Sequence, residues 1–393
     1  MQSETINPVA APRIVSVDIL RGLVMVLMAL DHVRDFWGPT AYDPLDLSQT
    51  SPELYVTRWI THFCAPVFVF LAGTSAFLYR RNTGISMQEL SRFLFTRGLW
   101  LVFIELTLVT FSWQFGFNFV ILQVIWAIGW SMVFLAAFVF LPVPVIAAIG
   151  LLMIGGHNLL DGIVPADFGD NAIYWSMAHV GFNYYPNAIG SLDVFVGYPL
   201  VPWIGVMAAG YAFGQILQLE SGRRDRVLLL SGLGMVLAFF LLRYLNVYGD
   251  LEPWSTQERG GLWTFLSFLD VEKYPPSLMF LLITLGPALA IMPLLENWRG
   301  WWADAVKVFG RVPFFYYVVH LPFINATGSL YAIIVYGSTG WWLQGPDAYP
   351  ADYEQNLLLV YVVWIATIAI LYLPCKWYAR YKRENKKWWL SYL

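Results

Sequence analysis

Three histidines carry most of the chemistry that this sequence offers. His32, His62 and His320 each lie within an apolar segment long enough to form a membrane helix. A histidine with an unperturbed pKa of about 6.5 can take a proton from an amine or a hydroxyl group as that group attacks a thioester. These side chains therefore indicate acid–base chemistry of the kind used in acyl transfer. The plainer alternative is that they are neutral histidines that pack at helix interfaces.

Two carboxylates are placed to assist the histidines. Asp31 directly precedes His32, and Glu105 lies about halfway along the third apolar segment. An ionisable side chain at membrane depth is costly unless it is paired or hydrated, which makes it a candidate for function by default. Either carboxylate is expected to set the tautomer and charge of a histidine. Glu105 has two alternatives, which are pairing with Arg21 and a protonated structural role.

The remaining motifs and reactive residues point to no further chemistry. The chain has no Walker loop, no dinucleotide glycine fingerprint, no GxSxG motif and no Cys/His cluster with metal-ligand spacing. No metal is therefore expected. His157 and His179 are predicted to be solvated at or beyond the outer surface, and Cys64 and Cys375 are predicted to be inert core residues.

The segment from Ile14 to Trp37 must position the first of these histidines. At about 1.5 Å per residue, a helix of this length crosses a hydrocarbon core about 30 Å thick. Helical spacing places a stripe of polar and small side chains opposite a row of leucines. The stripe comprises Asp18, Arg21, Gly22, Met25, Ala29 and His32. This pattern predicts a helix that lines a site, and the alternative is a structural ion pair between Asp18 and Arg21 near one interface.

The composition predicts an all-α, polytopic membrane protein. Of the 393 residues, 58% are hydrophobic and 12% are charged, whereas about 25% are charged in soluble domains. Apolar segments of helical length predict a bundle of about ten transmembrane helices. After the first, they cover residues 54–79, 93–113, 118–141, 143–160, 197–219, 227–247, 277–295, 311–336 and 355–378. The net charge of −3 argues against a nucleic-acid partner.

The charges of the loops predict the orientation of the bundle. Lys and Arg gather in alternate loops and in the C-terminal tail, so the positive-inside rule places both termini in the cytoplasm. We expect a polar tail over residues 1–12, a single transmembrane domain over 13–380 and a basic cytoplasmic tail over 381–393. The outside loop 161–196 is rich in aromatic residues and is expected to fold as a cap.

Several short motifs, in the right order along most of the chain, resemble a known family. They are Ser16-Val-Asp-Ile-Leu-Arg-Gly22, Asp31-His-Val-Arg-Asp-Phe36, Ala65-Pro-Val-Phe-Val-Phe-Leu-Ala-Gly73, Gly197-Tyr-Pro-Leu-Val-Pro-Trp-Ile-Gly205, Tyr274-Pro-Pro-Ser-Leu278 and Phe309-Gly-Arg-Val-Pro-Phe-Phe-Tyr-Tyr-Val-Val-His320. Together they are similar to the bacterial branch of the heparan-alpha-glucosaminide N-acetyltransferase catalytic-domain family. The resemblance implies a transmembrane enzyme that passes acetyl groups from cytosolic acetyl-CoA to an acceptor, often a sugar, on the far side.

The resemblance also bears on the histidines. His320 matches a late motif of the family. In the lysosomal member a catalytic histidine follows in the loop after helix 1, whereas residues 38–53 of this chain contain no histidine. Either His32 or His62 has taken over the role of the base, or the bacterial branch performs different chemistry. Glucosamine specificity therefore does not carry over.

The predicted function is acyl transfer across the bacterial inner membrane by a multi-pass protein. Its predicted partners are the lipid bilayer, acetyl-CoA or another acyl-CoA as donor, and an extracytoplasmic glycan or other acceptor, and a homodimer is left open. The residues expected on the donor side are Asp18 and Arg21, which belong to the first-helix signature, and Arg80, Arg81, Arg223 and Arg224, which would bind CoA phosphates. The alternatives are a proton-coupled transporter or exporter that uses the same His and Glu residues, and a membrane scaffold.

Overall fold

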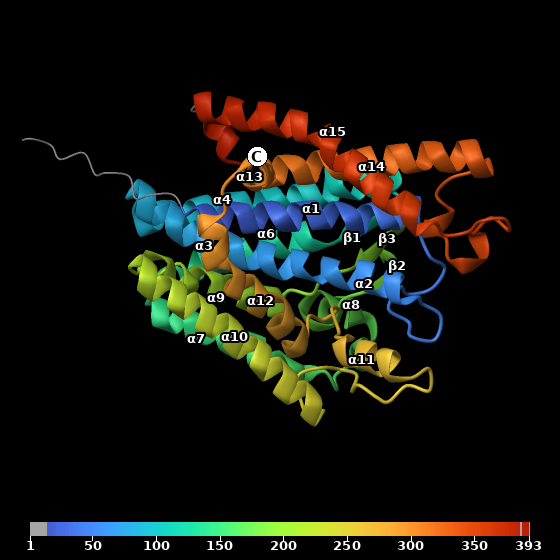
Figure 1. Cartoon of the computed structure of the whole chain (residues 1–393), viewed down its shortest axis with the longest axis horizontal. Coiled ribbons are helices and arrows are strands. Elements are labelled where there is room, and N and C mark those ends of the chain that lie inside the picture. Colours follow the sequence, from blue (N-terminus) through green and yellow to red (C-terminus); the bar gives the residue numbers. More distant parts are fainter. Residues whose placement is uncertain (1–13, 386, 393) are drawn as a thin grey trace, which may run out of the picture.

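The computed structural model describes residues 14–385 and 387–392 and shows a helical bundle built around α1 (Val15–Trp37) (Figure 1). The predicted tail 1–12 lies outside these residues. The other α-helices are α2 (Pro52–Ile60), α3 (Cys64–Thr83), α4 (Met87–Ile104), α5 (Thr110–Gln114), α6 (Val124–Phe138), α7 (Val143–Gly156), α8 (Ala172–Trp175), α9 (Val201–Phe213), α10 (Ser221–Leu245), α11 (Gly261–Leu269), α12 (Leu278–Asn297), α13 (Trp301–Arg311), α14 (Pro313–Tyr336) and α15 (Leu357–Glu384). The predicted all-α class is confirmed.

Every predicted apolar segment contains a helix of this bundle. Seven stretches in the described part of the chain are long and apolar enough to cross a membrane, namely Pro52–Thr83, Met87–Gln114, Val143–Leu160, Ser221–Leu245, Leu278–Asn297, Pro313–Tyr336 and Leu357–Glu384. Helix α1 has sufficient length but carries several charges, and α6 and α9 are shorter. The count of ten spans and the cytoplasmic termini therefore stay predictions.

Helix α1 is central because neighbours cover it on several sides. It packs against α3, α12, α13, α14 and α15, and it runs through the middle of the bundle in Figure 1. A residue of another helix caps the N-terminus of α1. The Glu296 carboxylate at the end of α12 accepts hydrogen bonds from the backbone N–H of Val15 at 3.3 Å and of Ser16 at 2.7 Å. A carboxylate at a helix N-terminus satisfies free amides and complements the helix dipole.

The sequence did not predict α13, which packs closely against the N-terminal half of α1. A Cβ atom placed on Gly310 of α13 would lie 1.8 Å from the carbonyl oxygen of Asp18, and one placed on Gly22 of α1 would lie 2.1 Å from that of Val306. The two backbones can approach this closely only because neither position has a side chain. The small residues of the predicted stripe thus serve helix packing at this end.

A small three-stranded sheet covers one end of the bundle. It consists of β1 (Phe119–Leu122), β2 (Asn183–Ile189) and β3 (Leu192–Val196), in the order β1-β3-β2. Strand β1 runs parallel to β3, with Val120 opposite Val194, and β2 runs antiparallel to β3. Two of the strands, α8 and short helical turns occupy residues 161–196, so this segment is folded, and its place outside the membrane stays a prediction. The predicted span 118–141 differs, because it begins as strand β1 and becomes helical only at Val124.

Candidate active site

A large cavity opens among the loops at one end of the bundle. It has a volume of about 1950 Å³ and is lined by the loop after α1, the junction of α2 and α3, the segment between α10 and α12, and the segment after α14. Residues 180–184 of the predicted outside loop 161–196 also line the cavity. The charged and titratable lining residues include Asp31, His32, Arg34, Asp35, Arg58, His62, Arg243, Asp250, Glu252, Asp270, Glu272 and Lys273.

His32 lies at the wall of this cavity between a carboxylate and a second histidine. Its Nδ1 atom is 3.5 Å from Oδ2 of Asp35, one turn further along α1. The centre of its ring lies 5.2 Å from that of His320 and 5.3 Å from that of Trp113. A carboxylate at one ring nitrogen orients an imidazole and stabilises its protonated form, as a general base requires.

His320 of α14 is held by backbone carbonyls. Its Nδ1 atom lies 3.0 Å from the carbonyl oxygen of Tyr316 and 2.7 Å from that of Tyr317. Because carbonyls only accept hydrogen bonds, Nδ1 carries the proton and Nε2 keeps its lone pair. Nε2 is buried and has no hydrogen-bond partner in the part of the chain that the structure describes. The ring of Tyr316 stacks on the imidazole, with ring centres 5.0 Å apart.

His62 lines the same cavity from a break in the second predicted span. Thr61–Phe63 form a 3₁₀ turn between α2 and α3, consistent with Pro66, which cannot donate to the His62 carbonyl. The side chain is 1% exposed, and Phe280 packs against it with ring centres 5.2 Å apart. Within residues 14–385 and 387–392, neither ring nitrogen has a hydrogen-bond partner. His32 and His62 therefore line one cavity, and the carboxylate of Asp35 lies beside His32.

Asp31 takes part in an ion-pair network beside His32. Its Oδ1 atom lies 3.1 Å from Arg34 Nη1 and 3.6 Å from Arg58 Nη1, and it accepts a hydrogen bond of 2.9 Å from Thr61. The carboxylate that contacts the imidazole is instead that of Asp35. The sequence contained this signal, because residues three apart in a helix face the same side.

Glu105 caps a helix. It begins a π-helical turn, Glu105–Val109, and its carboxylate accepts the N–H groups of Gln123 at 3.2 Å and Trp126 at 3.0 Å. These amides lie at the N-terminus of α6, where intrahelical partners are missing. The expected pairing with a histidine or with Arg21 is thus replaced by a structural role, the alternative left open by the sequence. The carboxylate determines where α6 starts after strand β1.

The donor-side residues lie in two groups. Arg21 of α1 donates to the Gly310 carbonyl at 3.2 Å and to Ser75 Oγ at 2.6 Å, and its Nη1 atom is 3.9 Å from Asp18. These contacts join α1 to α3 and α13. The second group consists of Arg80 and Arg81 at the end of α3 and Arg223 and Arg224 at the start of α10. Both helix ends lie at the left in Figure 1, at the opposite end of the bundle from the loops that line the cavity.

The sequence profile described as Heparan-alpha-glucosaminide N-acetyltransferase, catalytic, matches residues 13–248, more than half of the chain. The chain belongs to this family. No curated protein matches the sequence. The chain is therefore an integral, multi-pass membrane protein with the catalytic domain of an acetyltransferase family. The matched region includes His32, His62 and Glu105, whereas His320 lies beyond it.

The sequence did not predict a cluster of charges on the cavity wall of this acetyltransferase-family protein. Arg243 of α10 is 3% exposed and lies 3.7 Å from Asp250. Asp270 and Glu272 lie between α11 and α12 and line the same wall. Burial, with the nearby carboxylates of Asp43 and Asp250, raises the pKa of Asp270 to about 7. Burial likewise raises the pKa of Glu272 to about 7.

These two carboxyl groups predict a loss of stability as the pH rises. Their pKa values in the unfolded chain are 3.8 and 4.5, so the fold favours the protonated forms. Their contribution is complete below about pH 4 and is lost as the pH rises through about 7. Allowing for partial exposure, we expect a loss of about 2 kcal/mol, visible as a lower Tm at pH 8 than at pH 5. Tryptophan fluorescence during heating in detergent measures it.

A double variant tests the assignment. Asp270→Asn with Glu272→Gln should flatten the dependence of Tm on pH, because neither amide titrates. Glu258→Gln, an equivalent change at an exposed loop position, should leave the dependence as it is in the parent protein. An unchanged pH dependence in the double variant would contradict the assignment to these groups.

Proposed function

We propose that the protein transfers an acetyl or other acyl group from cytosolic acyl-CoA to an extracytoplasmic sugar or glycan at the bacterial inner membrane. The observation that carries the proposal is the placement of His32. It lies at the wall of a large cavity with Asp35 at one ring nitrogen and His320 beside it, in a chain of an acetyltransferase family.

In the proposed reaction His32 is the general base. An acceptor hydroxyl or amine loses its proton to Nε2 of the imidazole as its oxygen or nitrogen attacks the thioester carbonyl. The new ester or amide bond forms, the carbon–sulfur bond breaks, and the CoA thiolate leaves and takes up a proton. Asp35 contacts the opposite ring nitrogen and stabilises the imidazolium formed during the step. Nε2 of His320 carries a lone pair and is available as a second base, with its ring centre 5.2 Å from that of His32.

The cavity wall suits a sugar acceptor. Sugar binding sites combine aromatic faces with polar groups that bond to hydroxyls. The aromatic lining residues include Trp113, Tyr198, Tyr274, Tyr317 and Trp342, and the carboxylates of Asp43, Asp250, Asp270 and Glu272 lie on the same wall. Acceptors with several hydroxyl or amino groups therefore match this lining better than an apolar lipid chain does.

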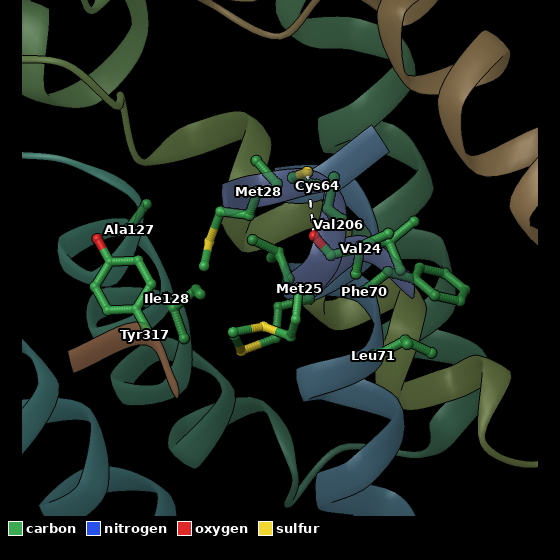
Figure 2. Packing of buried hydrophobic residues seen from close by; sticks show 14 of the residues in the cluster. Val24, Met25, Met28, Cys64, Phe70, Leu71, Ala127, Ile128, Val206 and Tyr317 are labelled. Carbon is green, nitrogen blue, oxygen red and sulfur yellow. Dashed lines mark hydrogen bonds between the residues drawn. The ribbon is translucent and has the colours of Figure 1, made fainter. Parts of the chain in front are cut away.

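On the donor side, a layer of apolar side chains lies beneath the cavity. Met28 of α1 lines the cavity, and Met25, one turn deeper, is 2% exposed. Figure 2 shows both methionines among Ile128 of α6, Tyr317 of α14 and Cys64 of α3. Methionine is unbranched and adapts its shape easily. We propose that the acyl arm of CoA passes here, with its phosphates bound by the arginines at the ends of α3 and α10.

Transfer of labelled acetyl groups tests the proposed function. The purified protein in proteoliposomes would receive radiolabelled acetyl-CoA and an extract of periplasmic glycans, lipid headgroups or peptidoglycan. We expect label in an extracted acceptor and release of CoA. Failure to label any acceptor, together with failure to bind CoA, would overturn the proposal. Substrate flux that needs no acyl donor would favour the transporter instead.

A further inference from the structure

Three metal-ligating side chains meet outside the cavity, beyond the end of α7. His157 begins the 3₁₀ turn that follows α7, Asp161 comes directly after this turn, and His179 lies in the π-helical turn Ser176–Val180. One ligand atom from each side chain lies within 4.8 Å of the other two. The histidines are far apart in the sequence, so no motif connects them.

Burial of the two histidines overturns the prediction that they are solvated. His157 is 2% exposed and His179 is 1% exposed. Among the described residues, both ring nitrogens of His157 and Nδ1 of His179 have no hydrogen-bond partner of normal geometry. The backbone of Pro276 lies beside the His157 ring. Buried nitrogens without partners are rare in folded proteins, and each calls for an explanation such as a bound ion.

The third ligand is held in place by its neighbours. Oδ1 of Asp161 lies 3.1 Å from Nε2 of His179, while Oδ2 accepts a hydrogen bond of 2.8 Å from the Asn158 amide. Asn158 is itself fixed, because its oxygen accepts the N–H of Leu278 at the start of α12. Hydrogen bonds that orient a coordinating carboxylate in this way are typical of metal sites.

We propose that His157, Asp161 and His179 bind a divalent transition-metal ion, with zinc as the best match. Two imidazole nitrogens and one carboxylate oxygen form a common zinc ligand set that leaves a fourth position for water. Binding replaces the proton between His179 and Asp161 with the metal ion, and the proton is released to solvent. Aromatic packing closes one side, since the Trp175 and His179 rings lie 5.4 Å apart.

The proposed site would fix part of the cavity wall. Val180, Gly181 and Phe182 line the cavity and follow His179 directly. A metal ion would join this segment to the end of α7 and, through Asn158, to the start of α12. Its role is structural, and the inference does not depend on acyl transfer.

Metal binding by the full-length protein tests the site. The protein, without a histidine tag, would be dialysed and titrated with Zn²⁺ against a chromophoric chelator, and its metal content would be measured by mass spectrometry. We expect one Zn²⁺ per chain, a higher Tm with Zn²⁺, and visible absorption typical of tetrahedral Co²⁺ when cobalt replaces zinc. His157→Gln and His179→Gln should each weaken binding at least about 100-fold.

Two further variants keep the test decisive. Asp161→Asn changes a partly exposed residue conservatively, so it should fold even where a histidine variant does not, and it should also lose zinc. His62→Gln alters an equally buried histidine outside the cluster and should keep zinc with unchanged affinity. Absence of stoichiometric zinc in the parent protein, or undiminished binding in Asp161→Asn and His179→Gln, would overturn the proposal.

Discussion

Replacement of His32 by glutamine is expected to lower the rate of acyl transfer by about 10²-fold to 10⁴-fold, the usual contribution of a general base. Glutamine resembles imidazole in polarity but cannot take up the proton of the acceptor. It should leave the binding of CoA unchanged, because the proposed phosphate site lies at the other end of the bundle (Figure 1). Initial rates of transfer from labelled acetyl-CoA, measured with CoA affinity, separate the two effects.

His62→Gln is the matched comparison for His32→Gln. Both side chains line the cavity and are buried, but the carboxylate of Asp35 lies 3.5 Å from Nδ1 of His32, whereas the ring of His62 packs against Phe280. The change at His62 should therefore cost much less activity. Equal losses in the two variants would mean that both histidines act in transfer. A large loss at His62 alone would make His62 the base and contradict our assignment.

Gly310→Ala is expected to destabilise the protein by at least about 3 kcal/mol, at the upper end of the usual cost of overpacking. The new Cβ atom would lie 1.8 Å from the carbonyl oxygen of Asp18, which is backbone and cannot rotate away. Helix α13 would have to move from α1, and the hydrogen bond from Arg21 to the Gly310 carbonyl would be lost. Thermal unfolding in detergent and the yield of membrane-inserted protein measure the effect.

A second glycine provides the control for this substitution. Gly234 lies within α10, and a Cβ atom placed there meets nothing within 4 Å. Gly234→Ala should therefore leave Tm unchanged or raise it slightly, because alanine restricts the unfolded chain more than glycine does. Equal stability of Gly310→Ala and Gly234→Ala would show that α13 does not approach α1 as closely as described here.

The sequence located the candidate histidines but not their partners. Helical spacing put His32 on the polar stripe of α1, and His62 fell within the second apolar segment. By contrast, the contact of His32 with His320 joins helices far apart in the chain. Spacing also suggested that Asp31 assists His32, but Asp31 lies among arginines and Asp35 faces the imidazole. Neighbouring carboxylates look alike in sequence, and only their surroundings distinguish them.

The sequence by itself determined the class of this protein, because the apolar segments and their length require a membrane helical bundle. Its short motifs, taken together in their order along the chain, indicated the family. Only the tertiary structure decided the role of Glu105 as a cap of α6, the packing of α13 on α1, and the meeting of His157 with His179. The physical reason is that the spacing of polar and apolar residues along the chain describes the faces of one helix at a time. Contacts between helices depend on how closely two backbones approach each other, which no single segment encodes.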